Sequence, residues 1–142
     1  MWAVVVALCA LCLRSTASAQ AAEFLLVGDS DHSTFLGCLN CSRFDSGSVC
    51  NRFGDAGSRF SSTSIWNPFG NYGSRFSPTS PWNKFASDPP VIVDRQGNFY
   101  GYFTASRLHS QRTTIQFFLA FLDNVDQVTE DLQRARDAFC DE

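Results

Sequence analysis

The chain has 142 residues with a formal net charge of −3, and aromatic residues make up 14% of it. That length fits a single domain and leaves little room for two. The mild acidity argues against a nucleic-acid-binding protein, which is expected to carry a basic face and a high isoelectric point. Between residues 38 and 85 the only large aliphatic residues are Leu39, Val49 and Ile65, which excludes an ordinary aliphatic core in that stretch.

Residues 1–19 are predicted to be a secretory signal peptide. Their apolar run, Ala3 to Leu13, is shorter than the roughly 20 residues that a helix needs to span a bilayer. A cleavage motif of small residues, Ala17-Ser18-Ala19, follows it. No Lys or Arg precedes the apolar run, so an uncleaved membrane anchor is the alternative. We expect residues 20–142 to form one secreted or periplasmic domain with no transmembrane segment in the mature chain.

Residues 23–37 predict an N-terminal β-hairpin, because two apolar runs flank the turn-forming sequence DSDHS. Gly28-Asp29-Ser30, at the end of the first run, looks like the block that carries the nucleophile of GDSL-type esterases. The late Asp-x-x-His of that family is missing, since Ser106 stands three residues before His109. Gly, Asp and Ser are also the residues that favour turns, so the block can be explained by a turn between two strands without a catalytic role.

A hydrolase that depends on this turn is nevertheless the alternative function. It would be a small secreted enzyme with Ser30 as its nucleophile or with a metal ion in the turn. The metal ligands would be Asp29, Asp31 and His32.

Residues 38–85 consist of three 16-residue repeats without insertion or deletion: CLNCSRFDSGSVCNRF, GDAGSRFSSTSIWNPF and GNYGSRFSPTSPWNKF. We number them unit 1 (38–53), unit 2 (54–69) and unit 3 (70–85). Gly pairs and Ser/Thr clusters, both of which form turns, recur every seven to nine residues. The sequence therefore predicts two short strands per unit.

One repeated position, occupied by Arg43, Arg59 and Arg75, bears on how these strands are arranged. In a β-solenoid, equivalent residues stack about 4.8 Å apart, and the arginines would repel by about 1 kcal/mol per pair in water. In an antiparallel meander the separation is about 10 Å, and the repulsion falls to about 0.4 kcal/mol. No repeated position carries an acidic residue in every unit that could offset the repulsion between the arginines. We therefore favour the meander over a short β-solenoid.

Residues 86–104 predict a second β-hairpin, in which VIV and FYGYFT flank the turn-rich DRQGN. From 112 to 140, apolar residues recur at helical spacings, and Asp123-Asn124 could divide this segment as an N-cap. Residues 115–122 are apolar on nearly every face, and we expect burial beneath the sheet. The predicted fold class is α+β: a repetitive antiparallel β region with a β-hairpin and one or two C-terminal helices.

Four cysteines remain after cleavage, and an oxidising compartment predicts two disulfides among them. Cys38 and Cys41 replace the glycines of a repeated G-x-x-G turn, a spacing that brings their Cα atoms within disulfide range. We favour Cys38 with Cys41 and Cys50 with Cys140, which closes a loop of about 90 residues. The alternative pairing is Cys41 with Cys50 and Cys38 with Cys140. A redox C-x-x-C pair and a zinc site are alternative roles.

The sequence predicts no catalytic constellation, metal site or cofactor, because its two histidines have no acid or nucleophile at a recognisable spacing. Candidate ligand-binding residues lie in the repeats, where ring faces can stack on sugars and Arg or Asn can bind hydroxyls or carboxylates. They are Arg43, Arg59, Arg75, Trp66, Asn67, Trp82 and Asn83. The alternative is that Phe and Trp fill the core in place of the missing aliphatic residues.

The tract G-x-x-G-S-R-F-S-x-T-S-x-W-N-x-F, followed by DPPVIVDRQGNFYGYFT, resembles a group of small secreted bacterial proteins of uncharacterised function. The resemblance implies bacterial export and carries over no activity or site residue. We therefore expect an exported, disulfide-bonded, non-catalytic binding or structural module of the cell envelope or extracellular space. Its partner would be an anionic polysaccharide or another envelope component, and not nucleic acid.

Overall fold

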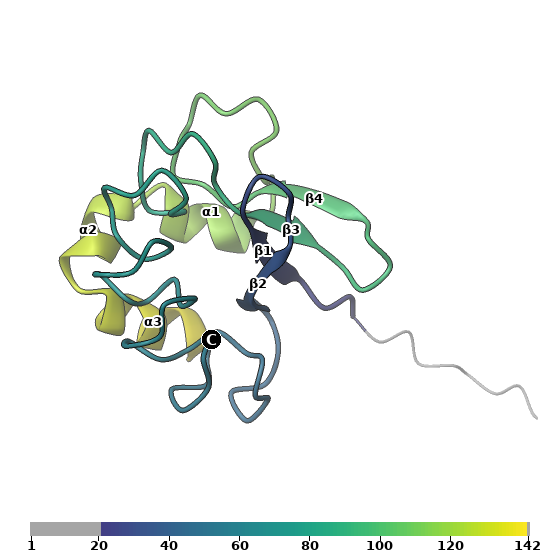
Figure 1. The fold of residues 1–142 in the computed structure, drawn as a ribbon, viewed down its shortest axis with the longest axis vertical. Coiled ribbons are helices and arrows are strands. Elements are labelled where there is room, and N and C mark those ends of the chain that lie inside the picture. Colours follow the sequence, from purple (N-terminus) through teal and green to yellow (C-terminus); the bar gives the residue numbers. More distant parts are fainter. Residues whose placement is uncertain (1–20, 142) are drawn as a thin grey trace, which may run out of the picture.

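The computed structural model describes residues 21–141, so the predicted signal peptide lies outside the described residues. Four strands form one antiparallel sheet, and three helices follow them (Figure 1). The strands, in the spatial order β2-β1-β3-β4, are β1 (Leu25–Gly28), β2 (Thr34–Cys38), β3 (Val91–Val93) and β4 (Phe99–Tyr102). The helices are α1 (Gln116–Leu122), α2 (Val125–Glu130) and α3 (Leu132–Cys140). The predicted α+β class is confirmed.

Both predicted hairpins are present, and they join into one sheet. β1 pairs with β2, β3 pairs with β4, and β1 pairs with β3 through Leu26 opposite Ile92. Both of these residues are fully buried. The repeats therefore leave the sheet after β2 and return to it at β3 (Figure 1).

The strands predicted within the repeats are absent, since residues 39–90, all of them described, contain no strand. The chain instead turns every three residues: the backbone N–H of Ser64 donates to Ser61, that of Asn67 to Ser64, and that of Gly70 to Asn67. Each turn begins with Ser, Asp or Asn, whose side chain accepts the N–H two residues later. These local bonds occupy the backbone groups that a strand would pair with a neighbour, so the strand prediction is wrong.

The units stack on one another. The rings of Trp66 and Trp82, at equivalent positions of units 2 and 3, have centroids 5.6 Å apart. That distance is near the spacing of a solenoid and far from the roughly 10 Å of a meander. Each indole N–H donates to one repeated carbonyl of the preceding unit, Trp66 to Val49 at 2.8 Å and Trp82 to Ile65 at 2.6 Å. The two indoles thus hold the three units in register.

Both ends of the stack are attached to the sheet. At unit 1, the carbonyl of Cys38, the last residue of β2, accepts the N–H of Val49 at 3.0 Å. At unit 3, the carbonyl of Pro81, equivalent to that of Ile65, accepts the N–H of Ala105 at 2.8 Å. Strand pairing therefore sets where the stack begins and where it ends.

The preference for a meander is wrong. Acidic residues outside the repeats offset some of the basic charges within them, although among the three equivalent arginines of the described chain only Arg43 forms an ion pair. The carboxylates come from the C-terminal helices and from the residue that follows them. Three ion pairs connect the two parts: Arg43 with Asp141 at 3.0 Å, Arg52 with Asp137 at 2.6 Å, and Lys84 with Asp126 at 2.7 Å. Each exposed pair is worth about 1 kcal/mol at most, but together they direct the acidic helices onto the basic repeats.

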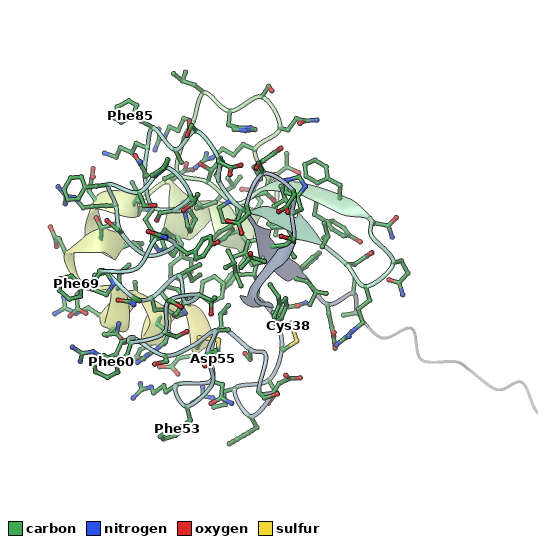
Figure 2. All side chains as sticks on the ribbon, in the orientation of Figure 1. Cys38, Phe53, Asp55, Phe60, Phe69 and Phe85 are labelled. Atoms are coloured by element: carbon green, nitrogen blue, oxygen red, sulfur yellow. A yellow bond between two sulfur atoms is a disulfide. The ribbon has the colours of Figure 1, made fainter. Side chains whose placement is uncertain are left out.

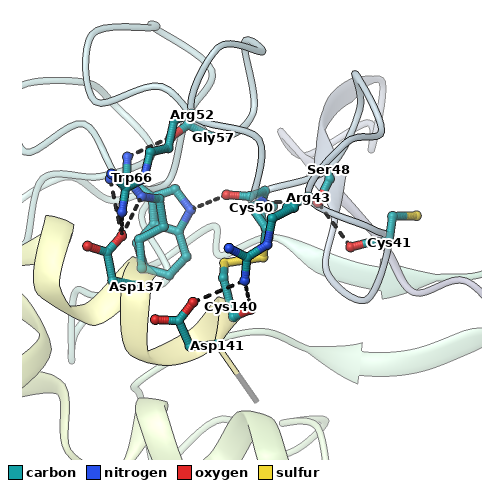
Figure 3. The surroundings of a disulfide bond; sticks show 12 residues. Cys41, Arg43, Ser48, Cys50, Arg52, Gly57, Trp66, Asp137, Cys140 and Asp141 are labelled. Carbon is teal, nitrogen blue, oxygen red and sulfur yellow. Dashed lines mark hydrogen bonds and ion pairs between the residues drawn. A yellow bond between two sulfur atoms is a disulfide. The ribbon is translucent and has the colours of Figure 1, made fainter.

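The favoured disulfide pairing is confirmed. Cys38 pairs with Cys41, with Cα atoms 5.5 Å apart, and Cys50 pairs with Cys140, with Cα atoms 5.6 Å apart (Figure 3). Cysteines joined in disulfides cannot supply the thiolates that a zinc site needs. The redox role of Cys38 and Cys41 stays a prediction, because a disulfide is the oxidised form of such a pair. Cys50 stands where the other units carry tryptophan, so in unit 1 a covalent bond to α3 replaces the indole.

The segment predicted as one or two helices contains three. The break at Asp123-Asn124 is confirmed, although Asn124 makes no side-chain cap. α3 begins separately because the Asp131 carboxylate accepts the backbone N–H groups of Gln133 and Arg134, at 3.1 and 3.0 Å. In α1 the residues buried against the core are Phe118 and Leu122.

A closed ring of five aromatic side chains forms the centre of the core. Neighbouring centroids are 5.6 to 6.1 Å apart, and no member is more than 3% exposed. Its members are Trp66, Trp82, Phe103, Phe118 and Phe139. Because they come from unit 2, unit 3, the residue after β4, α1 and α3, the ring joins the repeats to the sheet and to two of the three helices. Each such pair adds about 0.5 to 1.5 kcal/mol beyond the burial of its area.

At the junction of units 1 and 2 the backbone passes so close to itself that one added methyl group should strongly destabilise the fold. A Cβ at Gly57 would lie 2.0 Å from the carbonyl oxygen of Asn51. We expect Gly57→Ala to lower the free energy of unfolding, measured by urea denaturation of the oxidised protein, by about 3 kcal/mol or more. Gly47→Ala is the control, because its nearest neighbour would be 3.4 Å away, and it should change stability by less than about 1 kcal/mol. Equal effects of the two substitutions would contradict the stacking.

Candidate functional site

Six phenylalanines of the repeats point into solvent, with exposed fractions from 80% to 100%. Figure 2 shows Phe53, Phe60, Phe69 and Phe85 projecting outward along the margin of the repeat stack. We call the six side chains the aromatic face: Phe44, Phe53, Phe60, Phe69, Phe76 and Phe85. The interpretation that repeat phenylalanines fill the core is therefore wrong, because the aromatic residues of the repeats that are buried there are Trp66, Trp82 and Tyr72.

The three-residue turns decide which aromatic rings are exposed. Unit 2 makes four consecutive turns that start at Ser58, Ser61, Ser64 and Asn67, and the aromatic rings stand at the third residue of a turn. The turn that starts at Ser64 faces the core, and both this serine and the tryptophan at its third position are 0% exposed. The first and last turns face outward, so their phenylalanines do too.

Four of the seven candidate ligand-binding residues have structural roles. Trp66 and Trp82 are 0% and 1% exposed, so neither ring can stack on a ligand, and the prediction for them is wrong because their position faces the core. Asn67 and Asn83 use both ends of the amide within the turns. Each amide nitrogen donates to a backbone carbonyl six residues earlier, and each oxygen accepts the N–H two residues later.

The three candidate arginines differ in their partners. Arg43 is engaged with α3, donating to the carbonyl of Cys140 at 3.1 Å and to the carboxylate of Asp141 at 3.0 Å (Figure 3). Arg59 and Arg75 instead lie over the rings of the phenylalanines that follow them, 5.0 Å from each centroid. Within residues 21–141, neither has a carboxylate within 4 Å. Their guanidinium groups are therefore available to a ligand.

Units 2 and 3 each form a groove against the C-terminal helices. Groove 1, of about 440 Å³, lies between unit 2 and the junction of α2 and α3, and groove 2, of about 500 Å³, lies between unit 3 and α2. Thr129 lines both, so the grooves adjoin. Five equivalent repeat positions line both grooves, and Trp82 lines groove 2 in addition. The five are Arg59, Phe60, Asn67, Pro68 and Phe69 in groove 1, and Arg75, Phe76, Asn83, Lys84 and Phe85 in groove 2.

The helix side of each groove is acidic. Glu130 and Asp131 line groove 1, and Asp126, 2.7 Å from Lys84, lines groove 2. Hydrogen bonds from the backbone N–H groups, that of Arg134 above all, hold the pKa of Asp131 below its usual value, so this carboxylate is ionised at neutral pH. Each groove thus combines ring faces with cationic and anionic groups, which suits a ligand that both donates and accepts hydrogen bonds.

The turn between β1 and β2 attaches the first hairpin to unit 3. Asp29 accepts hydrogen bonds from the hydroxyl of Thr34 and, at 2.6 Å, from that of Tyr72. These bonds lower the pKa of Asp29, whereas burial and the bond to Asp29 raise the pKa of Tyr72 to about 12. Asp31 accepts the hydroxyl of Ser33 at 2.7 Å. Both carboxylates therefore have a structural part in the turn.

Comparison with protein-family models, with curated proteins and with solved structures finds no match to this chain. Among residues 21–141, no group of three His, Cys, Asp or Glu side chains could hold a metal ion. None of the described helices is long and apolar enough to cross a membrane. The aromatic face and its grooves are therefore the features from which a function can be inferred.

Sequence reasoning missed the exposed phenylalanines and the helix side of the grooves. The sequence does contain a signal for the exposed phenylalanines. Phe recurs at alternating spacings of nine and seven residues, and each unit has Ser, Asp or Asn at four positions three residues apart. Neither pattern has the period of two that a half-buried strand requires. No pattern in the sequence indicates that Asp126, Thr129 and Asp131 face the repeats.

The Tyr72–Asp29 bond predicts a change of stability at alkaline pH. Because the pKa of Tyr72 is about 12 in the folded state against 10 ordinarily, its contribution is complete below pH 10 and lost as pH rises through 12. Tyr72→Phe should remove the phenolate absorbance step near pH 12 and flatten the fall in unfolding free energy above pH 10. Tyr100→Phe is the control, since Tyr100 bonds to a different carboxylate, Asp94. A step that persists in Tyr72→Phe would contradict the assignment.

Proposed function

We propose that this protein is an exported, non-catalytic binding module whose ligand surface is the aromatic face of units 2 and 3 with its two grooves. The equivalence of the grooves carries the proposal, because the same five repeat positions line both and the same helix faces both. Four of these five positions carry the same residue type in both grooves, and a single fortuitous hollow would not recur in this way at a 16-residue interval. Repetition of a site along a stack of repeats is how solenoid proteins build extended binding surfaces.

The exposure of the phenylalanines supports a role in binding. Burying a phenylalanine side chain is worth about 1.5 to 3 kcal/mol, and the six rings of the aromatic face gain almost none of this within the chain. Large contiguous apolar surfaces on folded proteins mark interaction sites. A partner that covers these rings would gain that energy.

A saccharide polymer of the envelope or extracellular space is the ligand class that the grooves fit best. Sugar rings have apolar faces that stack on aromatic rings, and their hydroxyls bond to guanidinium and carboxylate groups alike. Phe60 and Arg59 offer this combination in groove 1, and Phe76 and Arg75 offer it in groove 2. The two disulfides are compatible with an oxidising compartment, where such polymers lie outside the cell.

The hydrolase alternative stays a prediction that no contact favours. Asp29 is committed to Thr34 and Tyr72, and Asp31 is committed to Ser33. Both acids that would orient a catalytic group or hold a metal at Ser30 are thus part of the turn. We propose no reaction there.

Binding to a panel of neutral and acidic polysaccharides, measured by affinity electrophoresis, tests the proposal. The double variant Phe60→Ala/Phe76→Ala should weaken binding about tenfold, because two stacking contacts of about 0.5 to 1.5 kcal/mol each are lost. Phe44→Ala is the matched control: it has the same repeat position and 88% exposure, but lies in unit 1, where Arg43 is paired with Asp141. It should leave binding unchanged.

Two outcomes would contradict the proposed function. One is the absence of binding to every polysaccharide of the panel. The other is an equal loss in Phe44→Ala and in the double variant, which would place the ligand away from the grooves.

A further inference from the structure

We propose that grooves 1 and 2 act as one continuous site for a single linear, uncharged oligosaccharide that runs along the stack from unit 2 to unit 3. This inference rests on the proposed function and names its ligand. It requires that the grooves be adjacent and in register, that their charge disfavour an anionic chain, and that unit 1 be excluded from the site.

Adjacency follows from a shared wall and from the register of the units. Thr129 lines both grooves, so no intervening element separates them. The rings of Trp66 and Trp82, on the buried side of the same units, are 5.6 Å apart, so units 2 and 3 are in register where they meet the core. Successive parts of an extended oligosaccharide would therefore meet successive copies of the same Arg and Phe pair.

The charges of the two grooves differ, which disfavours a polymer with an acid group on every sugar. Groove 1 has two carboxylates beside Arg59, whereas groove 2 has two basic side chains, Arg75 and Lys84, with Asp126 2.7 Å from Lys84. An acidic sugar would therefore be attracted in groove 2 but repelled by the net negative charge of groove 1. Hydroxyl groups can donate to these carboxylates and accept from the guanidinium groups, so an uncharged glycan satisfies both.

Groove 1 is also lined by Gln133, whose side-chain oxygen accepts no hydrogen bond from the described part of the chain. The side-chain amide of Gln133 donates to the carbonyl of Trp66 at 2.9 Å, but its Oε1 is shielded from solvent and has no hydrogen-bond partner within the described part of the chain. Buried polar atoms in native proteins are nearly always satisfied. A sugar hydroxyl that enters groove 1 would supply the donor after a small rotation of the amide.

Unit 1 does not extend the site, because α3 occupies the equivalent place. Arg43 and Arg52, which correspond to the groove positions of Arg59 and Pro68, are paired with Asp141 and Asp137. Figure 3 shows both arginines directed toward the end of α3, beside the disulfide between Cys50 and Cys140. The site therefore spans two units and should saturate with a short oligomer.

Isothermal titration of the full disulfide-bonded chain with oligosaccharides of increasing length tests this site. The uncharged probes are cello-, chito-, xylo- and manno-oligosaccharides from the disaccharide to the hexasaccharide, and the matched acidic probes are oligogalacturonates. For an uncharged series that binds, affinity should rise about tenfold or more with length and then level off, with one long oligomer bound per protein. Oligogalacturonates of equal length should bind more weakly.

Paired variants show whether one chain occupies both grooves. Phe60→Ala/Phe69→Ala alters groove 1 and Phe76→Ala/Phe85→Ala alters groove 2, and either change should reduce the affinity of the hexasaccharide to that of a disaccharide. Phe44→Ala/Phe53→Ala changes the same positions in unit 1, and it should have no effect. All six side chains are at least 80% exposed, so the three variants are expected to fold alike.

The contrary results separate this inference from the proposed function. Disaccharides that bind as tightly as hexasaccharides, with two bound per protein, would overturn the continuous site and leave the binding module intact. Tighter binding of oligogalacturonates would overturn the uncharged ligand alone. The failure of every oligosaccharide to bind would overturn both.

Discussion

A side-chain oxygen that accepts the backbone N–H two residues later is the interaction on which this structure depends. Because Ser, Asp or Asn stands at four positions three residues apart in each unit, successive turns follow one another and the backbone needs no partner strand. In units 2 and 3 these turns direct the tryptophan inward and the two phenylalanines outward. The same local chemistry therefore produces both the core, through Trp66 and Trp82, and the aromatic face.

The buried tryptophans fix the position of each repeat unit relative to the unit before it. Each indole donates one hydrogen bond to the preceding unit and also packs within the ring of five aromatic side chains. A shift of one unit along the next would therefore break the hydrogen bond and the aromatic contact. Once the units are in register, the acidic C-terminal helices meet the basic repeats at fixed points, and the grooves form at the junction. Binding geometry in units 2 and 3 thus depends on groups that no ligand touches.

Much of this fold is predictable from the sequence because it depends on short-range signals. Both hairpins, the break at Asp123-Asn124 and the disulfide pairing follow from turn residues, helical spacing and the alignment of Cys38 and Cys41 with glycines. The repeat conformation was mispredicted because Ser/Thr clusters were interpreted as turns between strands, when the turns themselves are continuous. The repeats alone favour a meander, because within them the arginine column has no acidic partner. In the structure Asp141 pairs with Arg43 from beyond α3, and Arg59 and Arg75 each lie over the ring of the phenylalanine that follows. The groove walls escape prediction because they require the docking of α2 and α3, which is a tertiary event.

Hydrogen exchange at the indole N–H groups of Trp66 and Trp82, followed by NMR, tests the stacked arrangement most directly. Each proton is hydrogen-bonded to a carbonyl of the preceding unit, and each indole is buried among the five aromatic side chains of the core. Both protons should therefore exchange as slowly as the most protected core amides. If the repeats formed a meander that presented these tryptophans to a ligand, both protons would exchange as fast as those of free indole, and the stacked structure would be contradicted.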